Sequence, residues 1–161
     1  MTIRCVHNTG KVLRDYENKR LSKDTFGRFG TSWHTEFGLE IGKDYLVMGV
    51  LYGEGTLDYL IDEGGYISAY PYPLFEVVDN RLPSNWFFKS LKNTDNNYPY
   101  QEAICGYYEL VHDDTHYEKL VNYEEDACRI YFRRKIELEK SIEDQNFWGK
   151  WVNNKDDSVS D

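Results

Sequence analysis

The sequence predicts an α+β fold in which a small antiparallel β-barrel is followed by helices near the C-terminus. Short runs of β-branched and aromatic residues recur between residues 45 and 88, and strands of this length and spacing are typical of a meander that curls into a barrel. From residue 117 onward, apolar residues recur at spacings of three, four and seven, which is helical periodicity. A chain of 161 residues fits a single domain that buries about 70% of its unfolded surface.

The N-terminal part, residues 1–35, is predicted to form a hairpin and a loop. Residues 2–6 and 11–13 flank the sequence His-Asn-Thr-Gly, whose asparagine and glycine suit a turn with positive φ. Residues 14–32 are polar and contain Gly27 and Gly30, which favours a loop.

Residues 36–111 are predicted to form the barrel. Turn sequences such as Gly-Glu-Gly and Asp-Glu-Gly-Gly separate the runs, and Pro71 and Pro73 interrupt strand pairing because proline donates no ladder hydrogen bond. The predicted strands cover residues 45–52, 57–61, 66–70, 74–78, 86–88 and 103–111.

Residues 112–146 are predicted to be helical, with one broken helix or two consecutive helices between 116 and 144. Thr115, followed three positions later by Glu118, forms the pattern of a capping box. Acidic residues come early in this region and basic residues late, as a helix macrodipole favours. The polar residues 153–161 are expected to form a flexible tail.

The overall charge favours a cationic partner. The formal net charge is −9, so the field of the molecule repels nucleic-acid phosphates and anionic membrane surfaces. No apolar run is long enough to span a bilayer, and neither direct nucleic-acid binding nor membrane association is expected. The widely spaced Cys5, Cys105 and Cys128 suggest free thiols in a reducing cytoplasm.

An acidic, tyrosine-rich stretch supplies the candidate binding residues. Residues 54–80 contain six carboxylates and no lysine or arginine, and tyrosine is enriched at binding hot spots. The candidate partner-binding residues in this stretch are Glu54, Asp58, Asp62, Glu63, Tyr66, Tyr70 and Tyr72. A second acidic patch is predicted at Asp113, Asp114, Glu124 and Glu125. We expect at least two of the three tyrosines to be exposed, and the acidic groups to gather on one face.

Catalytic or metal chemistry has weaker support. His112 and His116 are four residues apart and Cys105 lies upstream, but a helix that begins near Thr115 excludes His112 from the helical face that paired zinc ligands would share. Cys105 is equally consistent with an inward strand position. No motif of a common nucleotide-binding or hydrolase class is present, so we predict no catalytic residues, no metal and no cofactor.

Three segments carry a family resemblance. GLEIGKDYLVMGVLY, LDYLID and PLFEVVDNRLPSNWFF, within residues 38–88, resemble small uncharacterised bacterial proteins built as aromatic-rich barrels of Src-homology-3-like character. The similarity continues more weakly into residues 116–139. Domains of this size and polarity look like the immunity proteins encoded beside polymorphic or contact-dependent toxins. The resemblance supplies no catalytic residues to carry over to this chain.

These observations lead to one hypothesis and two alternatives. The hypothesis is a non-catalytic, cytoplasmic immunity-type protein that neutralises a basic toxin, for example a nuclease, because an acidic surface is steered rapidly into a positive cleft. One alternative is an acidic regulator that imitates nucleic acid and occupies a DNA-binding protein. The other is a small enzyme that uses Cys105, His112 or His116.

Overall fold

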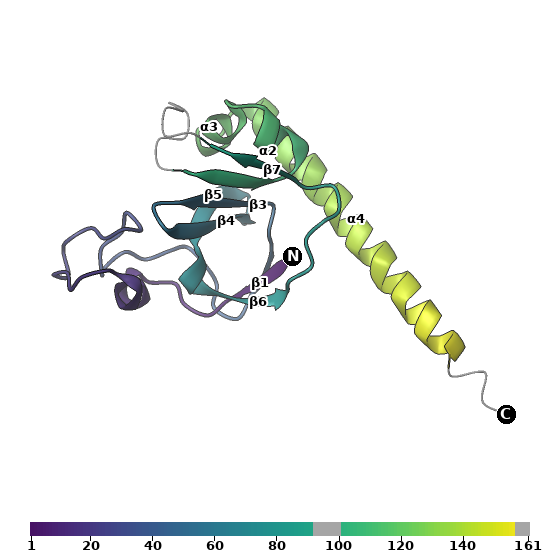
Figure 1. Ribbon diagram of the computed structural model, residues 1–161, viewed down its shortest axis with the longest axis horizontal. Coiled ribbons are helices and arrows are strands. Elements are labelled where there is room, and N and C mark those ends of the chain that lie inside the picture. Colours follow the sequence, from purple (N-terminus) through teal and green to yellow (C-terminus); the bar gives the residue numbers. More distant parts are fainter. Residues whose placement is uncertain (92–100, 157–161) are drawn as a thin grey trace. The chain divides into compact units, whose positions relative to one another are not determined.

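The computed structural model describes residues 1–91 and 101–156, with side chains described up to residue 144. The chain is α+β and divides into two compact units, Met1–Tyr123 and Glu124–Asp161. In the first unit a three-stranded sheet and a five-stranded sheet lie in layers, and two short helices cover the far side of the larger sheet (Figure 1).

The three-stranded sheet has the order β2-β1-β6 and is antiparallel throughout. It consists of β1 (Thr2–Cys5), β2 (Asp44–Leu46) and β6 (Phe75–Asp79). In β1 the side chains of Ile3 and Cys5 are fully buried, whereas Arg4 lies on the outer face and donates to Asp44 Oδ1 at 2.7 Å. This alternation is what a strand with one buried face requires.

The five-stranded sheet has the order β5-β4-β3-β8-β7. It consists of β3 (Gly49–Gly53), β4 (Thr56–Glu63), β5 (Tyr66–Pro71), β7 (Phe87–Ser90) and β8 (Ala103–Gly106). The turns predicted at Gly-Glu-Gly and Asp-Glu-Gly-Gly are present, and in each the two central residues have positive φ: 50° and 71° at Glu54 and Gly55, and 58° and 92° at Gly64 and Gly65. Such two-residue turns match the twist of the strands they connect.

The two faces of β4 serve two layers of packing. Tyr59 and Ile61 belong to the core between the sheets, together with Ile3, Leu13 and Leu74. The alternate residue Leu60, also fully buried, faces the opposite way. On that side α2 (Tyr108–His112) and α3 (His116–Val121) lie over the sheet (Figure 1).

Three predictions for strands are wrong. Residues 10–13 form the short helix α1 (Gly10–Leu13), continued by η1 (Arg14–Tyr16), and not a hairpin strand, because β1 finds both of its partners far along the chain. The strand predicted at 45–52 breaks between β2 and β3, where Val47 N donates to Met1 O and Met48 N to Leu60 O, so the chain passes from one sheet to the other. The strand predicted at 103–111 ends at Gly106, before α2.

The strand pairings do not close a barrel among the described residues. The two sheets share no ladder, and the chain crosses between them at residues 47–48 and through η2 (Tyr72–Leu74). The predicted antiparallel strands and C-terminal helices are therefore present, but the strands are divided between two sheets and do not form one meander, and closure into a barrel stays a prediction.

The predicted capping box is also wrong in detail. Thr115 does precede α3, but its hydroxyl donates to Asp113 Oδ1 at 2.7 Å and makes no bond to the helix. The carboxylate of Asp113 also accepts the backbone N–H of Thr115 at 3.0 Å. In such an Asp-centred turn, the aspartate carboxylate provides the hydrogen bonds for the backbone N–H and the hydroxyl of Thr115 before the helix begins.

The second unit contains α4 (Glu125–Asp156), a continuous helix of 32 residues. Ion pairs along its surface join Arg129 to Glu125 at 2.7 Å and Arg134 to Glu137 at 2.9 Å, at the spacing of neighbouring helical turns. Residues 153–156 of the predicted tail are helical, and the rest of that prediction, residues 157–161, lies outside the described residues.

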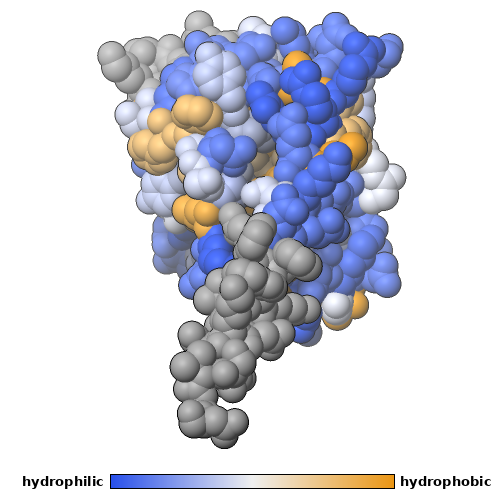
Figure 2. All heavy atoms as spheres, turned by 90° about the vertical axis from the view of Figure 1, so that its right-hand side faces the viewer, coloured by the Kyte–Doolittle hydropathy of each residue, from blue (hydrophilic) through white to orange (hydrophobic). Residues whose placement is uncertain are grey.

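One face of the molecule can be judged for its polarity in the space-filling view. The face drawn in Figure 2 is mostly hydrophilic, and its hydrophobic residues lie in small separate patches. Within the described residues, no helix is both long enough and apolar enough to cross a membrane.

Candidate binding site

Two hollows in the first unit contain residues that the sequence identified as binding candidates. We call the first the β5 pocket, a hollow of about 470 Å³ lined by Glu36, Phe37, Gly38, Glu63, Tyr66, Ser68, Ala69 and Tyr70. We call the second the turn pocket, a hollow of about 340 Å³ lined by Gly27, Arg28, Phe29, Gly30, Leu51, Gly53, Glu54, Thr56, Asp58 and Gln101.

The β5 pocket arises where the loop at residues 36–38 lies against β5. Phe37 N donates to Asn8 O at 2.8 Å, and the Phe37 ring makes an edge contact with Tyr70, with the ring centroids 6.1 Å apart. On β5, Tyr66, Ser68 and Tyr70 are two residues apart and so share one face. The hairpin register then places Glu63 directly opposite Tyr66.

The carboxylates of the β5 pocket differ in their partners. Glu63 accepts two bonds from Lys43 Nζ at 2.8 and 2.9 Å, and this ammonium, with the Tyr45 hydroxyl, lowers the pKa of Glu63. The carboxylate of Glu36 has no hydrogen bond or ion pair with any described residue, and Glu36 is exposed. The pocket thus presents one uncompensated negative charge beside aromatic rings, which suits a cationic side chain.

The predicted tyrosine exposure is confirmed. Tyr66 is 56% exposed and Tyr72 36% exposed, whereas Tyr70 is only 6% exposed. Tyr66 contacts the ring of Tyr123, with centroids 5.4 Å apart, and Tyr72 makes an edge contact with Tyr16 at 5.7 Å. Such contacts hold both rings in place while leaving part of each free for a partner.

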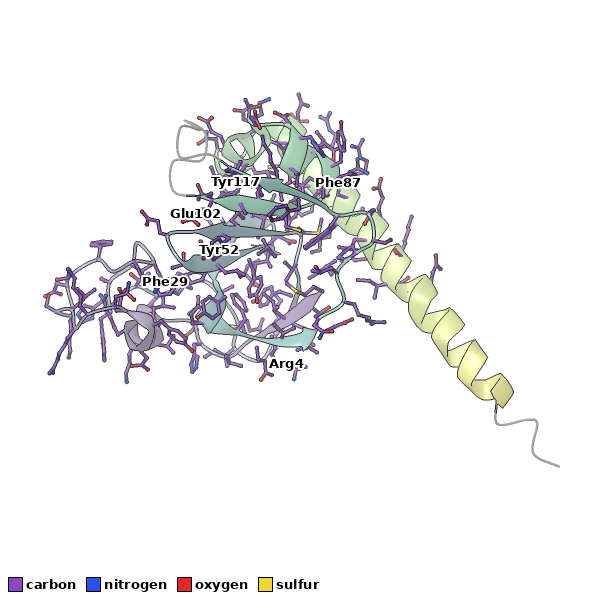
Figure 3. All side chains as sticks on the ribbon, in the orientation of Figure 1. Arg4, Phe29, Tyr52, Phe87, Glu102 and Tyr117 are labelled. Atoms are coloured by element: carbon purple, nitrogen blue, oxygen red, sulfur yellow. The ribbon has the colours of Figure 1, made fainter. Side chains whose placement is uncertain are left out.

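The turn pocket is built by an anchored N-terminal loop. The Glu17 carboxylate accepts the backbone N–H of Arg28 at 3.0 Å, and Arg28 Nη2 donates to the backbone carbonyl of Gly55 in the β3–β4 turn. The guanidinium also lies 5.3 Å from the Phe29 ring centroid. Figure 3 shows Phe29 near this end of the sheet, and Tyr117 of α3 on the helix-covered side.

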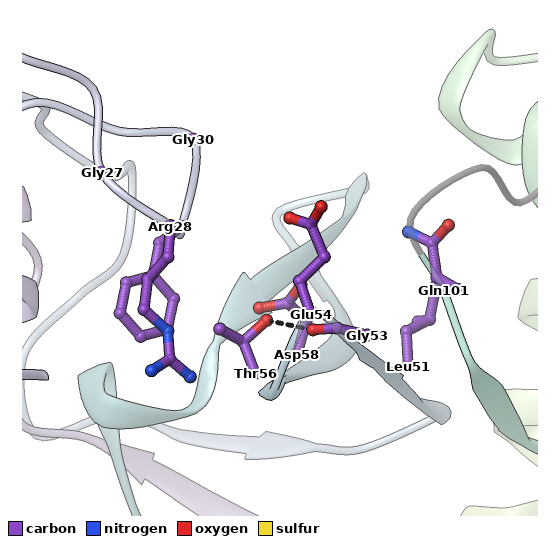
Figure 4. Close-up of a pocket in the computed structure, with 10 residues that line it drawn as sticks. Gly27, Arg28, Gly30, Leu51, Gly53, Glu54, Thr56, Asp58 and Gln101 are labelled. Atoms are coloured by element: carbon purple, nitrogen blue, oxygen red, sulfur yellow. Dashed lines mark hydrogen bonds between the residues drawn. The ribbon is translucent and has the colours of Figure 1, made fainter. Parts of the chain in front are cut away.

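Asp58 is the chemically unusual residue of the turn pocket. It makes no hydrogen bond or ion pair with any described residue, and burial alone raises its pKa to about 6. Arg28, although it lines the same hollow, is not among the causes of this shift. In Figure 4 Arg28 and Gln101 lie on opposite sides of the hollow, with Glu54 and Asp58 between them.

The other predicted residues lie elsewhere. Asp62 is next to Glu63 but points to the opposite face of β4, and its charge acts on Lys43. Asp113 holds the turn before α3, and Asp114 pairs with Lys89. In the second unit Glu124 is exposed and Glu125 pairs with Arg129.

The candidate residues of the first unit therefore do not gather on one face. Glu63, Tyr66 and Tyr70 share the β5 pocket, while Glu54 and Asp58 share the turn pocket. Asp58 and Glu63 are an odd number of positions apart on one strand, so their side chains leave opposite faces of the sheet. The expectation of a single acidic surface was wrong because it ignored this alternation.

Sequence reasoning missed most of the pocket linings, including Glu36 and Phe37 of the β5 pocket and Arg28 and Gln101 of the turn pocket. All four lie in loops, and tertiary contacts bring them beside strands distant in sequence. The only sequence signal was the pair of glycines in residues 27–30, which indicated a loop but did not indicate which strands the loop would contact.

The residues of the enzyme alternative do not converge. His116 is buried and its Nε2 lies 2.7 Å from the Tyr107 hydroxyl. His112 is exposed and makes an edge contact with Phe87 and a tilted ring contact with Tyr108. Cys105 pairs with Val50 on β3, and burial raises the pKa of its thiol, which disfavours the reactive thiolate. In the part of the chain that the structure describes, no three His, Cys, Asp or Glu side chains could hold a metal ion.

Comparisons with known proteins return no match. No family model matches the chain, and neither a curated protein nor a solved structure matches it. The two pockets and the charge of the molecule are therefore the basis for a functional proposal.

Proposed function

We propose that this chain is a non-catalytic immunity-type protein that acts in the cytoplasm and neutralises a basic protein toxin, with a nuclease as the best-fitting class. We further propose that its two sheets behave as one small barrel that carries the binding surface. The observation that supports this most is the β5 pocket, which combines Glu63, Tyr66 and Tyr70 with the uncompensated Glu36.

The chemistry of the β5 pocket fits an arginine or lysine side chain. A guanidinium or ammonium group gains from aromatic faces and from a nearby carboxylate, by about 0.5–2 kcal/mol for the aromatic contact. Tyr66 is more than half exposed and can lie against such a side chain. Rigid tyrosines provide contact area at a low entropic cost.

The charge of the whole chain supports the same kind of partner. At −9, it attracts a positively charged protein over distances of about a Debye length, roughly 8–10 Å in physiological salt. A nuclease must attract phosphates, so its active cleft is positive, and occupation of that cleft would block the enzyme. The alternative of a nucleic-acid mimic has less support, because several predicted carboxylates are neutralised within the chain by Lys43, Lys89 and Arg129.

The test is protection from the product of the reading frame adjacent to the gene for this chain. Expression of that product alone should stop bacterial growth, and co-expression of this chain should restore it. The double variant Glu36→Lys with Tyr66→Ala should bind the toxin at least about tenfold more weakly, since two contacts of about 1 kcal/mol each are lost, and should protect poorly.

Glu102→Lys is the matched control. Glu102 is also exposed, and the substitution makes the same change of charge without altering the β5 pocket. Full protection by the control and loss of protection by the double variant would support the proposal. Equal protection by both variants would eliminate the β5 pocket, and a neighbouring product that is harmless and does not bind would contradict the immunity role.

A further inference from the structure

We propose that the turn pocket is a second binding site, which takes an organic cation with an ammonium or guanidinium head group through the carboxylate of Asp58. This site is separate from the β5 pocket, and the inference does not depend on the immunity role. It follows from the hollow itself and from the position of Asp58 within it.

The strand register gives Asp58 no cross-strand neighbour that could bond to its carboxylate. Asp58 lies opposite Leu51 on β3 and opposite Pro71 on β5. Neither side chain offers a hydrogen bond, and proline has no backbone N–H. A carboxylate removed from water without such compensation is costly to keep charged, and a ligand cation would supply the missing partner.

Most of the other polar groups of the hollow are engaged or are themselves acidic. Two guanidinium nitrogens of Arg28 donate to the carbonyl oxygens of Gly55 and Tyr16, while its buried Nε has no partner among the described residues. The Thr56 hydroxyl donates to Gly53 O at 2.8 Å (Figure 4). Glu54 adds a second, exposed carboxylate at the same hollow. The two carboxylates outnumber the one guanidinium, so the hollow attracts a cation more than an anion.

The size of the hollow selects a small head group. About 340 Å³ is at the lower end of the range of roughly 300–1,000 Å³ for ligand pockets. The Gln101 amide, on the side opposite Arg28 (Figure 4), provides an oxygen that can accept a further N–H bond. A primary ammonium has three donors and a guanidinium five, so either head group keeps donors for further acceptors after it bonds to Asp58.

The pH dependence of binding follows from the groups that face Asp58. These are Arg28 on the loop, Glu54 on the turn and Tyr117 of α3, whose pKa is raised to about 12 by burial and by the charge of Asp58. Tyr117 therefore stays neutral at ordinary pH. Because the pKa of Asp58 is about 6, the carboxylate is mostly protonated at pH 5 and mostly ionised at pH 7.5, and the cation should bind only to the ionised form.

The experiment titrates the full-length protein, labelled with ¹³C at the aspartate carboxyl groups, with n-butylguanidinium and n-butylammonium. We expect the Asp58 signal to move, its pKa to fall when the probe saturates the site, and affinity to rise about tenfold from pH 5 to pH 7.5. Butyrate is the anionic control and should not bind. Asp58→Asn should abolish binding. The matched control is Glu36→Gln, which changes an exposed carboxylate outside this hollow and should leave the affinity unchanged.

Several outcomes would overturn the proposal. The first is that neither probe binds up to about 20 mM, which is well above the millimolar range expected for so small a ligand. The second is that butyrate binds as well as the cations. The third is that a folded Asp58→Asn variant binds the probes unchanged. The carboxyl signal in the unmodified protein keeps the test decisive if that variant does not fold. A capped peptide with one arginine then distinguishes a free small molecule from an arginine side chain of a partner protein. If the hollow admits a side chain attached to a polypeptide, the peptide should bind as well as n-butylguanidinium. If it admits only a free molecule, the peptide should bind more weakly.

Discussion

Asp58 and Glu63 lie on the same strand, yet their surroundings shift the pKa values of their carboxyl groups in opposite directions. Burial among apolar neighbours raises the pKa of Asp58 to about 6. The bonds from Lys43 and Tyr45 lower that of Glu63. Strand alternation explains the contrast, because the two side chains leave opposite faces of β4. Composition alone would count them as two equivalent negative charges.

The environment of Asp58 predicts a stabilising substitution. A carboxyl group whose pKa is higher in the folded state destabilises the fold once it ionises, so this cost is absent below about pH 3.8, grows as the pH rises and is complete above about pH 6. Asp58→Asn should therefore raise the free energy of unfolding at pH 7.5 by about 1–3 kcal/mol.

Chemical denaturation of the two proteins from pH 4 to pH 7.5 measures this difference. The gain from Asp58→Asn should shrink toward zero at the acid end of the range. Glu54→Gln, at an exposed position of the neighbouring turn, should show little change at any pH. A variant less stable than the unmodified protein at pH 7.5 would mean that Asp58 has a stabilising partner in the fold.

Among the secondary-structure elements, α2 shows how closely helix and sheet approach. Gly49 of β3 and Gly106 of β8 are paired, and Leu110 of α2 lies directly over both. A Cβ atom on Gly106 would come within 2.6 Å of Leu110 Cδ2, and one on Gly49 would also overlap this atom. Since Leu110 is fully buried, the two glycines set the distance between the helix and the sheet.

Gly49→Ala should consequently destabilise the protein by about 1–3 kcal/mol, the usual cost of adding volume to a packed core. Gly38→Ala is the control, because its Cβ would meet nothing within 4 Å and its φ is not positive. Urea unfolding of both variants tests this prediction. Equal stabilities would show that α2 moves away from the sheet at little cost.

Much of the strand order within the hairpins followed from local chemistry. The turns at Glu54–Gly55 and Gly64–Gly65 were predictable because positive φ favours glycine, and the strands around them alternate as a half-buried sheet does. The partners of β1 were not predictable in this way. Residues 10–13 were predicted to pair with residues 2–6 because they are close in sequence, whereas β1 pairs with residues 44–46 and 75–79.

For the molecule as a whole, net charge and local neutralisation act on different scales. The chain carries −9 overall, yet individual carboxylates pair with Lys43, Lys89, Arg81 and Arg129. The excess charge therefore acts mainly through long-range attraction, and the contacts that select a partner come from carboxylates left free beside aromatic rings, such as Glu36. Long-range attraction and short-range selection can be measured separately.

The association rate with the basic partner should fall by about tenfold or more as salt rises from about 0.02 M to about 0.3 M, because the Debye length shortens over this range. The dissociation rate should change much less, since it depends on close contacts. Stopped-flow measurements with the product of the adjacent reading frame provide both rates. An association rate that does not depend on salt would remove electrostatic steering from the proposed function.

The sequence by itself determined the class of the fold, the two glycine turns, the helical C-terminal region and the acidic, tyrosine-rich character of residues 54–80, because all of these depend on residues close together in the chain. Only the tertiary structure decided which carboxylates are neutralised, which face of β4 each occupies, and that loops at residues 27–30 and 36–38 complete two separate pockets. The physical reason is that a carboxylate's charge state and accessibility depend on neighbours brought together by folding, and these neighbours leave no periodic pattern in the sequence.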